Sequence, residues 1–193
     1  MDDLKKIVWL ASYPKSGNTW FRVFLSNLLS KENHPADINN LYATPIASNR
    51  ELFDEATGLS SSDLTPDEID NLRSGVYEYA AKNSNELLFQ KVHDAWLRSE
   101  SGEPMFDPKV TKAVIYFIRN PLDVAVSFAN HLNKSIDITV KVMADEGYAF
   151  SSTRDRLHNQ LRQRLLSWSG HVKSWIYNSN LPIIVLRYED MKT

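Results

Sequence analysis

The run at residues 113–118, Ala-Val-Ile-Tyr-Phe-Ile, constrains the fold of this chain more than any other stretch. It is apolar throughout, and its length and β-branched content are those of a central strand buried on both faces. Strands of that kind belong to parallel sheets that carry helices on both sides. The run therefore predicts an α/β protein with a mostly parallel central sheet flanked by helices.

Further strands and helices are predicted to alternate along the chain, as a parallel sheet requires. Three shorter apolar stretches predict strands, at residues 7–11, 87–92 and 182–187. Apolar side chains at helical spacing predict helices at residues 21–29 and 153–177, and a further short helix is predicted at 136–146. Capping residues predict two more: Thr65 and Glu68 can form a capping box for a helix over 66–82, and Asn120 can cap a helix over 121–133.

The stretch 153–177 is the clearest helix prediction, because its apolar side chains recur at intervals of three and four (Leu157, Leu161, Leu165, Trp168, Val172 and Trp175). Residues 32–62 lack any periodicity and contain several turn-forming residues. We predict that they form a surface excursion that, together with residues 136–152, could line a substrate pocket.

Composition limits the kind of protein this can be. With 193 residues, 42% of them hydrophobic, the chain suits a single domain over residues 1–193. A net charge of −2 predicts neither nucleic acid nor a membrane surface as a partner, so an anion site must come from local charge. There are no cysteines, which excludes disulfides, thiolate zinc sites and a cysteine nucleophile. No secretory signal or membrane span is evident, and we predict a cytoplasmic protein.

The segment between the first strand and the first helix is predicted to bind an anion. A strand–loop–helix points backbone N–H groups and the positive end of a helix at one spot, which suits phosphate or sulfate. Lys15 adds a charge there. The loop lacks the GxxxxGK[ST] pattern of nucleotide triphosphatases and the GxGxxG pattern of dehydrogenases, so both are disfavoured. The alternative is a turn that merely needs Pro14 and Gly17.

Other polar side chains also follow predicted strands. His93, Arg119 and Tyr188 stand just after them, as Lys15 does. Because ligands of open α/β sheets lie at the carboxyl ends of the strands, we expect one shared site. Arg119 has the fork geometry that matches phosphate oxygens, with Ser127 about two helical turns later. An ion pair of Arg119 with a nearby acid is the alternative.

A histidine is the candidate general base. An imidazole can accept the proton of an attacking hydroxyl near neutral pH. His93 is preferred among the five histidines because it follows a strand, and His131 is a weaker candidate.

Four motifs together resemble the sulfotransferases that use 3′-phosphoadenosine 5′-phosphosulfate (PAPS). The string YPKSGNTW at 13–20 resembles their 5′-phosphosulfate loop, and RNPLDVAVS at 119–127 resembles their 3′-phosphate motif. The triplet Lys91-Val92-His93 is similar to their lysine–x–histidine, and residues 188–190 are similar to their Tyr-Glu-Asp segment. The resemblance implies a P-loop-like sulfotransferase fold.

The resemblance also implies a role for each matched residue. The 5′ end of PAPS would be held by five loop residues, Lys15, Ser16, Gly17, Asn18 and Thr19. Trp20 would lie against the adenine. Arg119 and Ser127 would hold the 3′-phosphate, and Tyr188 would reach the adenine. His93 would be the catalytic base, with Lys15 at the bridging and leaving oxygens and Lys91 at the transferred sulfuryl group. The implied reaction transfers a sulfuryl group to a hydroxyl of a small molecule and needs no metal.

The sequence departs from the family at its end. Members continue beyond the Tyr-Glu-Asp segment with an RKGxxGDWK-like loop over the 3′-phosphate, whereas this sequence ends at Thr193. We therefore expect a C-terminally incomplete domain with weaker PAPS binding. One alternative is a nucleotide-binding module without turnover; a P-loop kinase is disfavoured by the displaced lysine and the missing magnesium-binding aspartate. The acceptor and the oligomeric state stay open.

Overall fold

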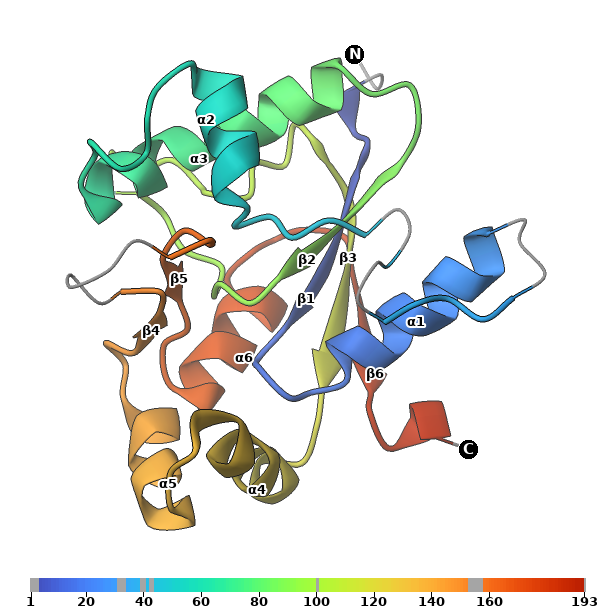
Figure 1. Ribbon diagram of the computed structural model, residues 1–193, viewed down its shortest axis with the longest axis vertical. Coiled ribbons are helices and arrows are strands. Elements are labelled where there is room, and N and C mark those ends of the chain that lie inside the picture. Colours follow the sequence, from blue (N-terminus) through green and yellow to red (C-terminus); the bar gives the residue numbers. More distant parts are fainter. Residues whose placement is uncertain are drawn as a thin grey trace.

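The computed structural model describes residues 4–30, 34–38, 41, 44–99, 101–152 and 158–192. Four parallel strands form the central sheet in the order β2-β1-β3-β6 (Figure 1). Their bounds are Ile7–Ser12 for β1, Leu88–Val92 for β2, Thr111–Ile118 for β3 and Ile183–Arg187 for β6. The predicted α/β fold with a mostly parallel sheet is confirmed.

Helices lie on both sides of this sheet and at its ends (Figure 1). Several helix starts have the caps that the sequence predicts: Thr65 and Glu68 form a capping box at α3, and the Asn120 side chain accepts from the Leu122 N–H at α4. The helices are α1 (Asn18–Leu29), α2 (Arg50–Thr57), α3 (Pro66–Lys82), α4 (Pro121–Leu132), α5 (Ile136–Ala144), α6 (Trp168–Ile176) and the 3₁₀ turn η2 (Asp190–Lys192).

The predicted helix over 153–177 is wrong for residues 158–167, whereas residues 168–176 are helical as predicted. Residues 153–157 lie outside the described residues, and a short strand, β5 (Gln163–Arg164), pairs antiparallel with β4 (Ala149–Phe150). Helix α6 starts only at Trp168, capped by Ser167. Leu161 and Leu165 are buried, and so is Gln163 between them. A spacing of four satisfies the two-residue period of a strand as well as the helical one, and the sequence could not separate them.

The predicted excursion over 32–62 also contains regular structure. Helix α2 begins after Asn49, whose side chain accepts from the Leu52 N–H. The chain just before it runs beside β2, because the Lys91 N–H donates to the Pro45 carbonyl (2.8 Å) and the Ala47 N–H donates to the Lys91 carbonyl (2.9 Å). This helix has only eight residues, with Leu52, Phe53 and Ala56 on its apolar side, so its pattern was too short to be recognised in the sequence.

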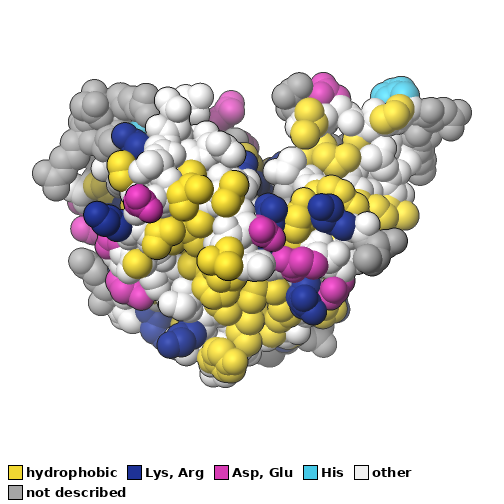
Figure 2. Space-filling model, turned by 90° about the horizontal axis from the view of Figure 1, so that it is seen from below, with side chains coloured by type: hydrophobic (Ala, Val, Ile, Leu, Met, Phe, Trp, Pro, Cys, Tyr) yellow, Lys and Arg dark blue, Asp and Glu magenta, His cyan; other side chains and the backbone are white. Residues whose placement is uncertain are grey.

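The carboxyl ends of the four strands point toward the viewer of Figure 2, because the strands run downward in Figure 1. From that side the surface is hollowed between two raised parts (Figure 2). Among the described residues, no helix is long and apolar enough to cross a bilayer.

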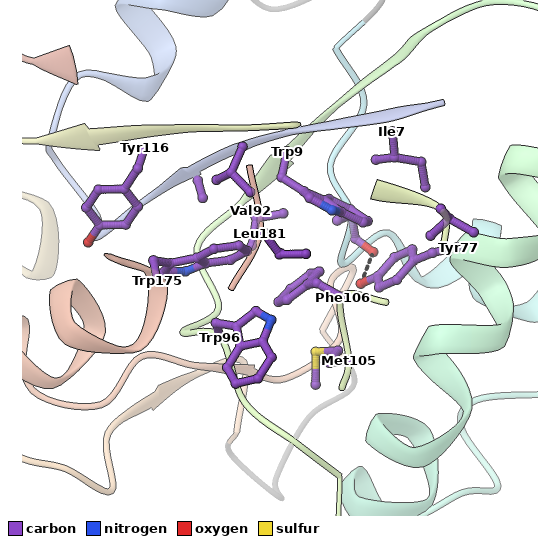
Figure 3. Close-up of a cluster of buried hydrophobic side chains, with 14 of the residues drawn as sticks. Ile7, Trp9, Tyr77, Val92, Trp96, Met105, Phe106, Tyr116, Trp175 and Leu181 are labelled. Atoms are coloured by element: carbon purple, nitrogen blue, oxygen red, sulfur yellow. Dashed lines mark hydrogen bonds between the residues drawn. The ribbon is translucent and has the colours of Figure 1, made fainter. Parts of the chain in front are cut away.

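The main core lies on one face of the sheet, where aromatic rings interlock (Figure 3). Trp9 of β1 packs edge-on against Tyr77 of α3 and against Phe106, with both pairs of ring centroids 4.9 Å apart. Trp175 of α6 closes the cluster against Phe106, at 5.0 Å between centroids. The other face holds a smaller cluster around Leu10, where α1 packs. The sheet is thereby fixed with its carboxyl ends open, which is where the site lies.

Candidate active site

A pocket of about 610 Å³ opens at the carboxyl ends of the strands. It corresponds to the position at which parallel α/β sheets bind ligands. The predicted site residues that line it come from the ends of β1, β2, β3 and β6 and from α1 and α4. They are Lys15, Lys91, His93, Arg119, Ser127 and Tyr188, joined by Gly17, Asn18, Thr19 and Trp20.

The loop after β1 is held in an unusual backbone conformation. Lys15 and Gly17 both have positive φ, at 68° and 102°. A Cβ at Gly17 would lie 2.5 Å from Tyr188 Cδ2, so this position admits only glycine. Tyr13 is buried and anchors the start of the loop edge-on against Phe128. The conformation leaves the N-terminus of α1 facing the pocket, as anion binding requires.

Two loop side chains do not face the pocket as the resemblance implies. The Asn18 amide turns back and donates to the Leu10 carbonyl (2.7 Å) and the Ser12 hydroxyl (3.2 Å). Ser16 is 1% exposed and is not among the pocket-lining residues. Asn18 therefore braces the loop through its side chain and has only its backbone N–H to offer a ligand. Thr19 and Trp20 are exposed at the pocket.

Arg119 ties three of the strand ends together. Its Nη1 donates to the Lys15 carbonyl (3.1 Å), and its guanidinium lies 4.4 Å from the centroid of the Tyr188 ring. The Tyr188 N–H donates to the Ile118 carbonyl (2.8 Å). No hydrogen bond among the described residues uses the buried Arg119 Nε. Arg119 lines the pocket, and the alternative of an ion pair with Asp123 is not present among the described residues.

His93 is held in one tautomer by the main chain. Its Nδ1 lies 2.9 Å from the Ser12 carbonyl oxygen, which can only accept, so Nδ1 carries the proton. In the neutral ring Nε2 is then unprotonated. Burial, and next the charge of Lys91, lower the pKa of His93 well below its usual range. Because His93 lines the pocket as a neutral imidazole, it can accept a proton from a bound hydroxyl.

A second histidine stands directly behind the first. His171 of α6 is fully buried, and its Nε2 donates to the His93 carbonyl (3.0 Å). Its Nδ1 therefore accepts from the Tyr116 hydroxyl (2.8 Å). Burial lowers the pKa of His171 to about 4, so it too is neutral at physiological pH. Sequence reasoning missed the role of this residue, because its bonds to His93 and Tyr116 span 78 and 55 residues of the sequence.

The charge around the pocket is positive. Lys15, Lys91 and Arg119 line it, and no Asp or Glu does so among the described residues. Burial, followed by the charges of Arg22 and Lys15, lowers the pKa of Lys91 to about 8. The described residues contain no cluster of His, Cys, Asp and Glu side chains fit for a metal ion. The site therefore has a local positive potential in a protein whose net charge is −2.

Sequence reasoning missed most of one wall of the pocket. This wall comes from β4, β5 and the chain before β5, and His131 of α4 stands beside it. The sequence would have indicated this polar wall only if residues 158–164 had been predicted as a strand instead of a helix. Phe150 and Ser151 fall in the stretch 136–152 that was predicted to line the pocket, and the missed residues are His158, Asn159, Gln160 and Gln163.

Comparison with known proteins identifies the family. The profile of the sulfotransferase domain matches residues 5–193, and the chain belongs to the sulfotransferase family. A search of the curated proteins finds no match.

Solved structures with the same fold include two of retinol dehydratase. One is a complex with androsterone and the inactive cofactor PAP (21% identity, TM-score 0.53), and the other is a complex with retinol and PAP (22% identity, TM-score 0.51). Each comparison covers 97% of this chain, and this chain spans 55% and 56% of those proteins. These likenesses confirm the predicted sulfotransferase fold.

Proposed function

We propose that this protein transfers a sulfuryl group from PAPS to a hydroxyl of a small-molecule acceptor. The observation that carries the proposal is that a neutral His93, unprotonated at Nε2, lines a pocket together with Lys15, Lys91 and Arg119. Among the described residues, no Asp or Glu lines this pocket. A base beside a cluster of cations suits attack by a hydroxyl on an anionic donor. The PAP-bound retinol dehydratase structures of the same fold support this donor.

The residues present fit a nucleotide with a phosphosulfate at one end. Gly17, with φ of 102°, allows the turn that brings the first residues of α1 to the pocket. Lys15 and the first N–H groups of α1 would hold the 5′ end. Arg119 and Ser127, which both line the pocket, would hold the 3′-phosphate, and Trp20, which is 45% exposed, offers a ring for the base.

In the proposed reaction His93 Nε2 accepts the acceptor's hydroxyl proton. The acceptor oxygen forms a bond to sulfur while the bond from sulfur to the bridging phosphate oxygen breaks, which releases PAP. Negative charge grows on that phosphate oxygen, where Lys15 and Lys91 stabilise it. One such preorganised donor is often worth about 3–4 kcal/mol of barrier. Lys91 carries its charge below about pH 8, because burial lowers its pKa to that value.

Transfer of radiolabelled sulfate from PAPS to a panel of phenols, alcohols and sugars tests the proposal. His93→Ala should lower transfer by roughly 100-fold or more while PAP still binds. His34→Ala is the matched control, because His34 is exposed and does not line the pocket. PAP binding without transfer to any acceptor would favour the module that binds without turnover. Transfer that depends on ATP and Mg²⁺ would favour the kinase.

A further inference from the structure

The wall that sequence reasoning missed is firmly attached to the rest of the protein. The Leu161 N–H donates to the Ser48 carbonyl (2.8 Å), and Arg50 Nε donates to the His158 carbonyl (2.8 Å). At the other end the Ala95 N–H donates to the Arg164 carbonyl (2.7 Å). Main-chain groups thus fix residues 158–164 against two separate parts of the chain, so side chains on this wall are presented in set positions.

Two glutamine side chains on this wall form a bonded pair. Gln163 Nε2 donates to Gln160 Oε1 (2.9 Å), and the Ser48 hydroxyl donates to the same oxygen (3.3 Å). Gln163 is 3% exposed and Ser48 is 2% exposed, so the pair is built into the wall rather than lying loosely on it. Both glutamines line the pocket.

The pair leaves one donor group and one acceptor group without partners among the described residues. An amide has two N–H donors and an oxygen with two lone pairs. The bond between the amides uses a donor of Gln163 and the oxygen of Gln160, which leaves the Gln160 NH₂ and the Gln163 oxygen. Exchanging N and O in both amides leaves the same two kinds of group, so this result does not depend on how they are assigned.

An adjacent donor and acceptor are complementary to a hydroxyl, which both donates and accepts. An amine would find no carboxylate among the described lining residues, and an apolar group would cover the amides without satisfying them. Such a site rejects a ligand that lacks the expected hydroxyl. The wall therefore selects for oxygen on the acceptor beyond the one that reacts.

The strand that carries Gln163 is bonded to the chain that follows the proposed base. Arg164, the neighbour of Gln163, bonds through its main chain to the Asp94 carboxylate (3.3 Å) and to Ala95. These two residues directly follow His93. His93 and the glutamine pair thus line one pocket from neighbouring stretches of chain, where one small acceptor can meet both.

We propose that the acceptor is a vicinal diol, of the kind that sugars and related polyols carry. One hydroxyl loses its proton to His93 and receives the sulfuryl group, and the adjacent hydroxyl binds the Gln160–Gln163 pair unchanged. The inference rests on the proposed function, because it takes His93 as the base.

Three matched cyclohexane alcohols test this inference. Each is titrated into the PAP-saturated protein and followed by ligand-observed NMR: trans-1,2-cyclohexanediol, trans-1,4-cyclohexanediol and cyclohexanol. The 1,2-diol should bind at least about tenfold more tightly than either of the others, because only its second hydroxyl reaches the amides. The 1,4-diol controls for polarity and hydroxyl number. Equal affinity for the two diols, or no binding of any of the three, overturns the inference.

Gln160→Met and Gln163→Met test the residues. Each keeps the side-chain length but removes the amide, so the preference for the 1,2-diol should fall below about threefold while cyclohexanol binding stays the same. The affinity for PAP, measured by calorimetry, should stay within about twofold of the native value, because PAP would bind to the other walls of the pocket. If one variant does not fold, the preference for the 1,2-diol is measured on the other variant. If neither folds, the affinities of the three alcohols for the native protein test the inference. A preference that survives in a folded variant overturns the inference. Absence of PAP binding to the native protein would instead overturn the proposed function.

Discussion

On one face of the central sheet, Trp9 and Phe106 are fully buried beneath α3 and α6, whereas on the other face Ile184 of β6 is 59% exposed. The second face has α1 and Met191 as its cover among the described residues, and several of its apolar side chains are only partly buried. The covered face also holds His171 and the Arg73–Asp94 ion pair (2.8 Å), which brace the chain around His93. The base of the proposed reaction is thus supported from the well-packed side, and the anion-binding loop leads into the helix on the sparsely covered side.

Phe106→Ala should produce the largest loss of stability. Its ring contacts Trp9, Tyr77 and Trp175 and is fully buried, so its removal leaves a cavity that the surrounding rings cannot fill. We expect the free energy of unfolding to fall by about 3–5 kcal/mol, measured by urea denaturation. A loss below about 1 kcal/mol would contradict the view that this face is tightly packed.

Acid should destabilise the covered face through His171. Its pKa is about 4 in the folded protein and ordinary, near 6.5, in the unfolded chain, so the unfolded state binds the proton first. The stability that the neutral ring contributes is complete above pH 6.5 and is lost as the pH falls toward 4, by up to about 3 kcal/mol.

Urea denaturation across this pH range, with His171→Gln as the comparison, measures the effect. The variant lacks the titrating ring, so its stability should fall less steeply with acid than that of the native protein. Parallel pH profiles would show that His171 is not the responsible group.

Phe21→Ala should cost less than the change at Phe106. Phe21 of α1 lies 4.9 Å from Phe117 between ring centroids but is only partly buried. Because the ring already touches solvent, we expect a loss of about 1–2 kcal/mol. Circular dichroism during thermal unfolding would measure it, and a loss equal to that of Phe106→Ala would remove the contrast between the faces.

Ile184→Thr should have the smallest effect on this chain. The side chain is largely exposed and threonine keeps the β-branched shape that a strand favours, so the change should stay within about 0.5 kcal/mol. Loss of an exposed apolar group should also reduce association, which sedimentation would detect. A large loss of stability would mean that Ile184 is covered in solution.

The parts of the molecule that the sequence predicted well are those set by local chemistry. The strand–loop–helix around Lys15 and Gly17 is specified by residues next to one another, and the cap at Thr65 by residues three apart. The meeting of His93 and Arg119 followed from the rule for parallel sheets. Their hydrogen-bond partners did not, because Ser12 and His171 reach His93 across long sequence separations.

The parts that were predicted wrongly or missed depend on what packs against a segment. Leu161 and Leu165 fitted both a helical and a strand period, and only pairing with β4 decides between them. On α1 the periodic positions Phe24 and Leu28 predicted a buried stripe, yet they are 48% and 65% exposed. Periodicity shows which side of a helix is apolar but does not show how much of that side another element covers.

The bond from His93 to Ser12 has a consequence for how this site tolerates mutation. The acceptor is a backbone carbonyl, which every amino acid possesses, so no substitution at position 12 can delete it. A point mutation at position 12 therefore leaves the acceptor for the Nδ1 proton in place, whereas a side-chain carboxylate in that role could be removed by a single substitution. Only a shift of β1 against β2, which would displace the whole strand end, would release the ring to its other tautomer.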